Sequence, residues 1–289
     1  MWSDAITGDL ERSRALDRVG KALGRAFSGV VRPGRLKDLL SGTWLAHPLH
    51  PMLTDVTVGA WTGALLLDVV GGEESRAGSD RLVLLGALSA VPTAVTGLSD
   101  LADVVNPEDR SVGAVHALGN VTALALFGMS YVARSRGNRR AGLFLSTAGM
   151  GVATGSGFLG GHLAYRLGIG VDQTRFEAGP SEWTAVLGDG ELPDGRPKRV
   201  AVGTTTLMLY RHDGRVLCIA NRCSHRGGPL HKGRVEGTVV RCPWHLSEFD
   251  LQDGAVVRGP ATAPQPAYEA RVREGKIEVR AALRSQLGP

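Results

Sequence analysis

Apolar residues form four long runs in the middle of the chain, and charged residues fall almost only where these runs end. The runs cover residues 51–70, 82–98, 112–133 and 141–165. Each is close to the ~20 residues that a helix needs to cross a ~30 Å hydrocarbon core. A soluble bundle would instead show a polar stripe at helical spacing in each run. The pattern therefore predicts four transmembrane helices, rich in the small residues that suit close packing in lipid.

The segments on either side of these runs have different patterns. Between residues 12 and 30, apolar residues recur at helical spacing with basic residues between them. This predicts an amphipathic helix that lies either on the membrane surface or against the protein itself. From about residue 180, short β-rich runs alternate with turns that contain glycine, which is typical of an antiparallel sheet.

These patterns predict a multidomain chain in which a four-helix transmembrane bundle precedes an all-β antiparallel domain. We expect a basic amphipathic N-terminal segment over residues 1–46 and the membrane domain over 47–166. A linker over 167–179 should then lead to the β domain over 180–283. The connections between the apolar runs are short, so the helices should run up and down and leave both termini on one side of the membrane.

Charge and cysteine content narrow the possible partners. The net charge of +5 is carried mainly by basic stretches over residues 12–37 and 134–140. Aromatic residues do not alternate with them, so anionic lipid is a better partner than nucleic acid. The first 30 residues show no secretory signal. Three cysteines cannot form a disulfide framework, and the spacing of two of them suits a metal better.

Two short motifs in the β domain carry the clearest chemistry. The first reads Cys223-Ser-His225 and the second Cys242-Pro-Trp-His245. Two cysteines and two histidines can bind zinc, although a Cys-x-His spacing is tight for one tetrahedral ion. In a histidine-ligated [2Fe–2S] cluster, one iron takes both thiolates and the other takes both imidazoles. Two loops that each supply one cysteine and one histidine meet that requirement.

The segments CSHRGGPL and CPWHLSEFDLQDG closely resemble the Rieske family, and the resemblance extends over residues 180–283. It implies a [2Fe–2S] cluster with Cys223, His225, Cys242 and His245 as metal ligands. It also implies that the segment RGPATAP, residues 258–264, is a third loop that covers the cluster.

Departures from the family pattern bear on the reduction potential. High-potential Rieske proteins have a disulfide between the two cluster loops, and Gly228 and Trp244 occupy those two positions here. This chain therefore resembles the ferredoxin or oxygenase subtype. The high-potential Rieske proteins also donate hydrogen bonds to cluster sulfurs from a serine and a tyrosine. Ser247 retains the first donor, and Phe249 has no hydroxyl to supply the second. We therefore expect a potential in the lower half of the Rieske range of roughly −150 to +300 mV.

Four histidines lie at the ends of the apolar runs. Counting the crossings places all four on the membrane face from which the β domain emerges, and Asp55 and Asp100 reach that face too. Polar groups at membrane depth are candidates for function. The histidines could bind haem b, a quinone or another metal, or they could simply cap helices and hydrogen-bond between them. They are His47, His50, His116 and His162.

The segments HPLHPMLTD, TAVTGLSDL and GGHLAYRLGIGV resemble an uncharacterised family of four-helix bacterial membrane proteins, the DUF2231 type. That family offers no established activity. The whole pattern favours a membrane-bound electron-transfer protein that exchanges single electrons with a membrane site or a redox partner. The alternative is a redox-sensing or protein-binding module without catalytic turnover.

We expect an electron carrier rather than a complete enzyme. No flavin or nicotinamide motif is present, and no histidine pair in a soluble segment suits the mononuclear iron of an oxygenase. Basic residues near the helix ends do not fix the orientation. Iron–sulfur domains are assembled in the cytoplasm, so we expect a multi-pass protein of the cell membrane with its β domain in the cytoplasm.

Overall fold

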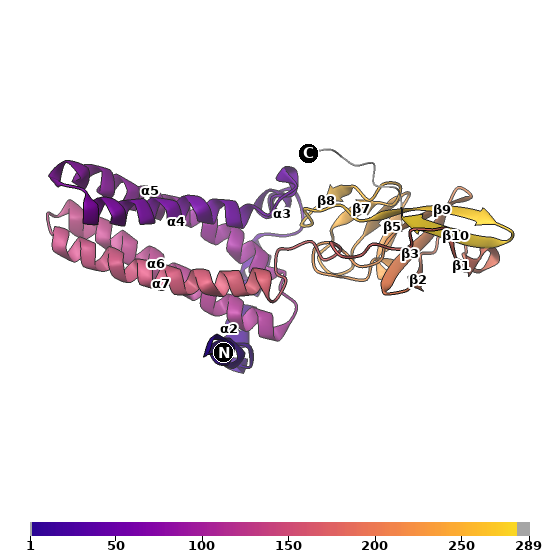
Figure 1. The fold of residues 1–289 in the computed structure, drawn as a ribbon, viewed down its shortest axis with the longest axis horizontal. Coiled ribbons are helices and arrows are strands. Elements are labelled where there is room, and N and C mark those ends of the chain that lie inside the picture. Colours follow the sequence, from indigo (N-terminus) through magenta and orange to yellow (C-terminus); the bar gives the residue numbers. More distant parts are fainter. Residues whose placement is uncertain (1, 282–289) are drawn as a thin grey trace. The chain divides into compact units, whose positions relative to one another are not determined.

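The computed structural model describes residues 2–281 and consists of two compact units (Figure 1). The helical unit contains the chain up to Arg32 together with Pro48–Gly170, and the second unit contains Pro33–His47 and the chain from Val171 onward. The N-terminal segment expected over residues 1–46 is therefore divided. Its last part, Pro33–His47, belongs to the β unit although it precedes the first long apolar helix.

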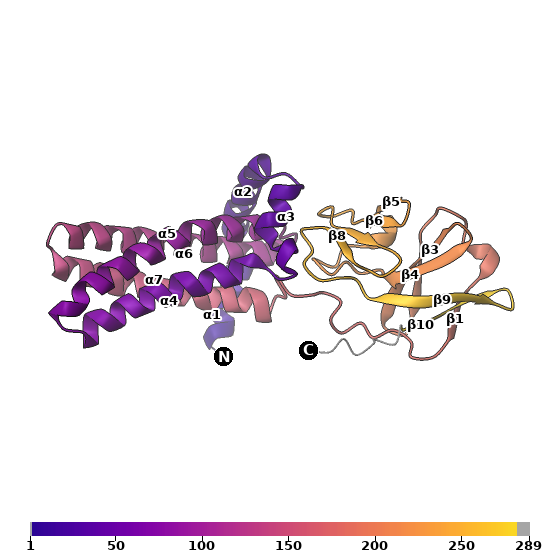
Figure 2. The ribbon, with the colours of Figure 1, turned by 90° about the horizontal axis from the view of Figure 1, so that it is seen from above.

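Six α-helices and the 3₁₀ turn η2 (Glu73–Ser75) form the described part of the helical unit (Figures 1 and 2). The α-helices are α1 (Trp2–Glu11), α2 (Arg14–Val30), α4 (Leu49–Val70), α5 (Arg76–Ala102), α6 (Pro107–Ser135) and α7 (Arg139–Tyr165). The last four are long and apolar enough to cross a membrane, which confirms the expected four-helix fold. Helices α5 and α6 extend beyond their apolar runs at both ends, into the flanking polar segments. Asn138 caps α7 by accepting a hydrogen bond from Ala141 N.

Helix α2 packs on the protein, the second of the two arrangements that its pattern allowed. Asp17 pairs with Arg110 of α6 at 2.6 Å. Gly20 lies against the same arginine, and a Cβ there would come within 2.7 Å of its backbone oxygen. Gly24 lies similarly against Ala102 of α5. Small residues on α2 therefore allow close helix approach, while its basic residues remain largely exposed.

The four long helices form two similar hairpins, α4–α5 and α6–α7. Helices α4 and α6 each pack on α5 and α7, and so they face each other diagonally across the bundle. Corresponding residues of α4 and α6 recur at identical spacing and meet in layers along the bundle axis. The layers are His50 with His116, Trp61 with Phe127, and Asp68 with Arg134.

Glycines of the second helix in each hairpin make room for these side chains. A Cβ at Gly86 of α5 would lie 2.3 Å from the Trp61 ring, and one at Gly149 of α7 would lie 3.0 Å from Phe127. The two aromatic rings stack with centroids 4.0 Å apart and planes 5° apart. The bundle is therefore a pseudo-symmetric pair of hairpins with an aromatic layer at its centre.

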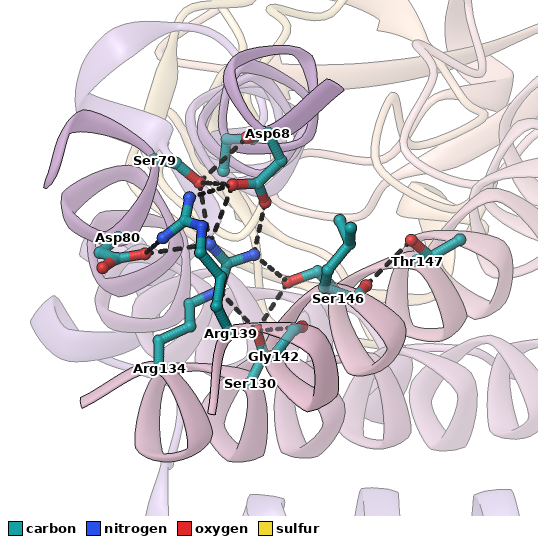
Figure 3. A network of polar contacts seen from close by, with 11 residues as sticks. Asp68, Ser79, Asp80, Ser130, Arg134, Arg139, Gly142, Ser146 and Thr147 are labelled. Atoms are coloured by element: carbon teal, nitrogen blue, oxygen red, sulfur yellow. Dashed lines mark hydrogen bonds and ion pairs between the residues drawn. The ribbon is translucent and has the colours of Figure 1, made fainter. Parts of the chain in front are cut away.

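A buried network of charges closes the end of the bundle where α4 and α6 finish (Figure 3). The side chains of Asp68 and Arg134 are 2% and 1% exposed and form an ion pair. Arg139 bonds the same carboxylate at 2.6 Å, and Asp80 bonds both arginines at 3.0 Å. Two positive and two negative charges thus balance, which limits the cost of burying them.

The β unit contains two antiparallel sheets. The larger has the strand order β1-β10-β9-β4-β3-β2 and the smaller the order β5-β6-β7-β8. The strands are β1 (Thr184–Gly188), β2 (Lys198–Val202), β3 (Thr205–His212), β4 (Arg215–Ala220), β5 (Arg234–Glu236), β6 (Val239–Arg241), β7 (Glu248–Asp250), β8 (Val256–Arg258), β9 (Ala267–Arg273) and β10 (Lys276–Ala281). The short helix α3 (Arg35–Ser41) and the 3₁₀ turn η1 (Thr43–Leu45) belong to this unit as well.

Two apolar clusters fill the β unit. One surrounds Leu207, Leu209 and Cys218 in the larger sheet, where Cys218 is a buried core residue. The other includes Phe249 together with Cys223 and Cys242. The two cysteine-bearing loops are therefore anchored directly in a hydrophobic core.

Candidate metal centre

Two loops present the Cys–His motifs. The first loop follows β4 of the larger sheet, leads toward β5 of the smaller sheet, and carries Cys223 and His225. The second joins β6 to β7 and carries Cys242 and His245. Both cysteines are about 1% exposed, because their side chains point into the core beneath the loops.

The two loops have equivalent backbone structures. In each, the cysteine carbonyl accepts a hydrogen bond from the N–H four residues later, from Gly227 at 2.8 Å and from Leu246 at 3.2 Å. The N–H of Cys223 donates to Gly228 O, and in the same way the N–H of Cys242 donates to Ser247 O. Gly227 and Leu246 both have positive φ, 75° and 66°. Glycine adopts that conformation easily, whereas leucine does so at a steric cost.

Because the loops are equivalent, each directs two backbone N–H groups at its cysteine sulfur. His225 and Arg226 donate to Cys223, and Trp244 and His245 donate to Cys242. A hydrogen bond with Cys223 and the two backbone N–H groups lower the pKa of the Cys242 thiol to about 7. Cys242 thus favours the thiolate, which is the form that binds metal, whereas the hydrogen bond to Cys242 and burial raise the pKa of the Cys223 thiol well above its ordinary value.

The two imidazoles lie beside each other, with ring centroids 5.0 Å apart and planes perpendicular. The cysteine sulfurs form a separate hydrogen-bonded pair. Within residues 2–281, no three His, Cys, Asp or Glu side chains gather closely enough to hold one metal ion. A sulfur pair and an imidazole pair suit a [2Fe–2S] cluster, in which each iron takes only two protein ligands.

Gly228 leaves the space that such a group requires. A Cβ at this position would lie 2.8 Å from the sulfur of Cys242 and 3.1 Å from the ring of Trp244. Any larger residue would therefore displace the second loop. The residues present fit the cluster in donor chemistry and in available space.

A third loop, which follows β8, is fastened to the other two by serine hydroxyls. Ser224 of the first loop donates to Ala263 O at 2.7 Å. Ser247, after the second loop, accepts from Ala261 N at 3.0 Å. Both serines are buried, and Ser247 is fully enclosed. Since the hydroxyl oxygen of Ser247 is already an acceptor here, its O–H remains available as a donor.

The segment formed by α3 and η1 covers part of the third loop, and sequence reasoning missed this. Thr43 Oγ1 donates to Ala261 O at 3.2 Å, and Arg258 lies 3.7 Å from Asp38. Gly259 is in such close contact that a Cβ there would lie 2.1 Å from Thr43 Oγ1. Lys37 is 5% exposed, and its charge acts on His225. This short segment has no hydrophobic periodicity from which its packing against the β domain could be predicted.

The structure brings together two of the four membrane histidines. His50 and His116 are 6.2 Å apart by ring centroid. His162 instead bonds Glu11 of α1 at 2.9 Å, and His47 is exposed in the segment assigned to the β unit. The expected group of four is thus one facing pair and two histidines with other surroundings.

Comparison with known proteins identifies both parts of the chain. The Rieske [2Fe-2S] domain family matches residues 182–269, and a family described as a predicted membrane protein (DUF2231) matches residues 46–173. The ferredoxin subunit of a 3-phenylpropionate/cinnamic acid dioxygenase from Photorhabdus laumondii is 34% identical over 90 residues, which cover 31% of this chain and 85% of the relative. Ferredoxin CarAc of Metapseudomonas resinovorans is 30% identical over 98 residues, covering 34% and 92%.

A solved structure is similar as well. It is the ferredoxin of the carbazole 1,9a-dioxygenase from Nocardioides aromaticivorans IC177, which is 29% identical. The match covers 35% of this chain and 100% of the ferredoxin, with a TM-score of 0.34.

Proposed function

The chain belongs to the Rieske [2Fe–2S] family, and on that premise we propose that Cys223 and Cys242 bind one iron of the cluster while His225 and His245 bind the other. The observation that carries this assignment is the equivalence of the two loops. Each holds its cysteine with the same pair of turn hydrogen bonds and directs two N–H groups at the sulfur. Such hydrogen bonds compensate the negative charge of a sulfur-ligated cluster.

The protein is a membrane-bound electron-transfer protein, since a Rieske domain of the ferredoxin type is joined to a membrane domain. When bound, the cluster supplies one-electron oxidation and reduction. Cys223 and Cys242, which would hold the cluster on one side, are buried in the core, whereas His225 and His245, which would hold it on the other, are partly exposed. Trp244 and Leu246, on either side of His245, are 47% and 39% exposed. We infer that these apolar side chains contact a redox partner protein, as aromatic residues often do at interfaces.

We place the Rieske domain on the cytoplasmic side, where iron–sulfur clusters are assembled and where a reductant is available. The chain is then an electron carrier between a soluble partner and the membrane. A redox-sensing module would carry the same cluster without sustained electron flow. Steady-state turnover with a quinone or with an artificial acceptor distinguishes the two.

Single substitutions test the ligand assignment in the full-length protein. His225→Ala or His245→Ala should abolish the rhombic EPR signal of the reduced cluster and should lower the iron content. His231→Ala is the matched control, because its Nδ1 bonds Asn221 Oδ1 at 2.8 Å and it lies outside both loops. Survival of the native signal in either ligand variant, or one zinc ion per chain in place of iron, would overturn the proposal.

A further inference from the structure

Two histidines face each other inside the membrane unit, and the two hairpins hold them in the same way. His50 Nδ1 lies 2.9 Å from Thr93 O of α5, and His116 Nδ1 lies 2.8 Å from Ser156 O of α7. In each hairpin a glycine lies one helical turn after that carbonyl and packs against the imidazole. A Cβ at Gly97 would lie 2.7 Å from His50 Cε1.

Gly160 has the same relation to His116, where a Cβ would lie 2.9 Å from Cε1. Both imidazoles therefore use Nδ1–H as a donor to a main-chain carbonyl, which leaves a lone pair on each Nε2. The contact with Asn120 agrees with this tautomer at His116, since the amide Nδ2 lies 3.0 Å from Nε2 and an amide nitrogen donates. An imidazole fixed through Nδ1–H to a carbonyl is the usual arrangement of a metal-binding histidine.

The separation of the rings matches coordination of one metal by both. Metal–nitrogen bonds are about 2.0 Å, so two imidazoles on opposite sides of one ion have centroids about 6.2 Å apart. The observed distance is 6.2 Å, with the planes at 87°. The two hairpins thus bring one imidazole from α4 and one from α6 together at a ring spacing that is compatible with a shared metal.

The donor set selects the kind of metal group. Within the part of the chain that the structure describes, no third His, Cys, Asp or Glu joins this pair. A bare zinc or copper ion would lack the three or four protein ligands that it normally takes. Haem iron receives four nitrogens from the porphyrin and needs only two axial ligands. Four-helix bundles commonly hold such groups between side chains of facing helices.

We propose that His50 and His116 are the axial ligands of a b-type haem in the membrane unit, with Asn120 displaced from His116 Nε2 when haem binds. A haem at this site would carry one electron at a time, as the cluster does. The assignment does not depend on the cluster ligands, because all of its residues lie in the helical unit.

The test is a spectrum of the full-length protein, produced with haem supplied and purified in detergent. The reduced-minus-oxidised spectrum should show sharp b-type bands, with one haem per chain by the pyridine haemochrome assay. His50→Ala and His116→Ala should each lower the haem content at least tenfold, and His162→Ala should retain it. Free imidazole added with haem to His116→Gly should restore the bands. The Rieske EPR signal should persist in every variant, which separates this test from that of the cluster.

Three results would overturn the proposal. The first is a protein that retains its cluster signal and helical circular dichroism but binds no haem when titrated with haemin. The second is haem binding that survives replacement of both histidines. The third is a solvent-extractable quinone that co-purifies in place of haem and is lost in His116→Ala, which would identify the same pocket as a quinone site.

Discussion

Replacing Ser247 with alanine should lower the reduction potential of the cluster. Ser247 is fully buried and accepts a hydrogen bond from Ala261 N, so its O–H is left to donate toward the cluster sulfurs. A hydrogen bond to a charged group contributes about 1.5–3 kcal/mol, and we assign about half of that, ~0.75–1.5 kcal/mol, to the difference between the two oxidation states. At about 59 mV per tenfold change for one electron, this lowers the midpoint by about 30–65 mV.

Ser224→Ala is the matched control. Ser224 is also buried, and it fastens the same third loop by donating to Ala263 O at 2.7 Å. Its proton is therefore not available to the cluster. Each substitution leaves a buried backbone group without its partner and should destabilise the domain by about 1–3 kcal/mol, but only Ser247→Ala should change the potential. An EPR-monitored redox titration of the full-length protein measures both variants. Equal shifts, or no shift in Ser247→Ala, would refute the reasoning.

Other substitutions test further parts of the structure. Phe249→Tyr adds a hydroxyl in the core that holds both cysteines and should raise the potential in the same titration. Lys37→Met removes a buried positive charge that acts on His225 and should lower the potential; no change would show that the charge does not reach the cluster. Gly228→Ala places a Cβ 2.8 Å from Cys242 Sγ and should reduce cluster occupancy, measured as iron and acid-labile sulfide per chain. Arg134→Met leaves the carboxylates of Asp68 and Asp80 against Arg139 alone and should destabilise the helical unit by about 3 kcal/mol in detergent unfolding, the low end of the cost of breaking a buried ion pair, and by more than the same change at the more exposed Arg139.

The sequence was most informative where chemistry restricts residue type. The spacing of Cys223, His225, Cys242 and His245 led to the two loops, and the apolar runs led to four membrane helices, because hydrocarbon excludes charge. The equivalence of the loops was harder to see. Gly227 marks the positive φ of the first loop, but the same position in the second loop is Leu246. No residue preference signals that conformation.

No pattern in the sequence predicts two features of the fold. The two hairpins have equivalent positions, such as Trp61 with Phe127 and Asp68 with Arg134. The residues at these positions differ in type, so the repeat is not visible in the sequence. The segment from Pro33 to His47 joins the β unit through a few polar contacts, including that of Thr43 with the third loop. Such contacts form between residues far apart in sequence, so local patterns do not contain them.

Pulsed EPR of the reduced full-length protein tests the central claim most directly. Nitrogen hyperfine couplings report which imidazoles bind the reduced cluster. The account predicts two strongly coupled histidine nitrogens in the wild-type protein, with unchanged couplings in His231→Ala. A reduced cluster without any strongly coupled nitrogen, or with only one, would contradict ligation by His225 and His245.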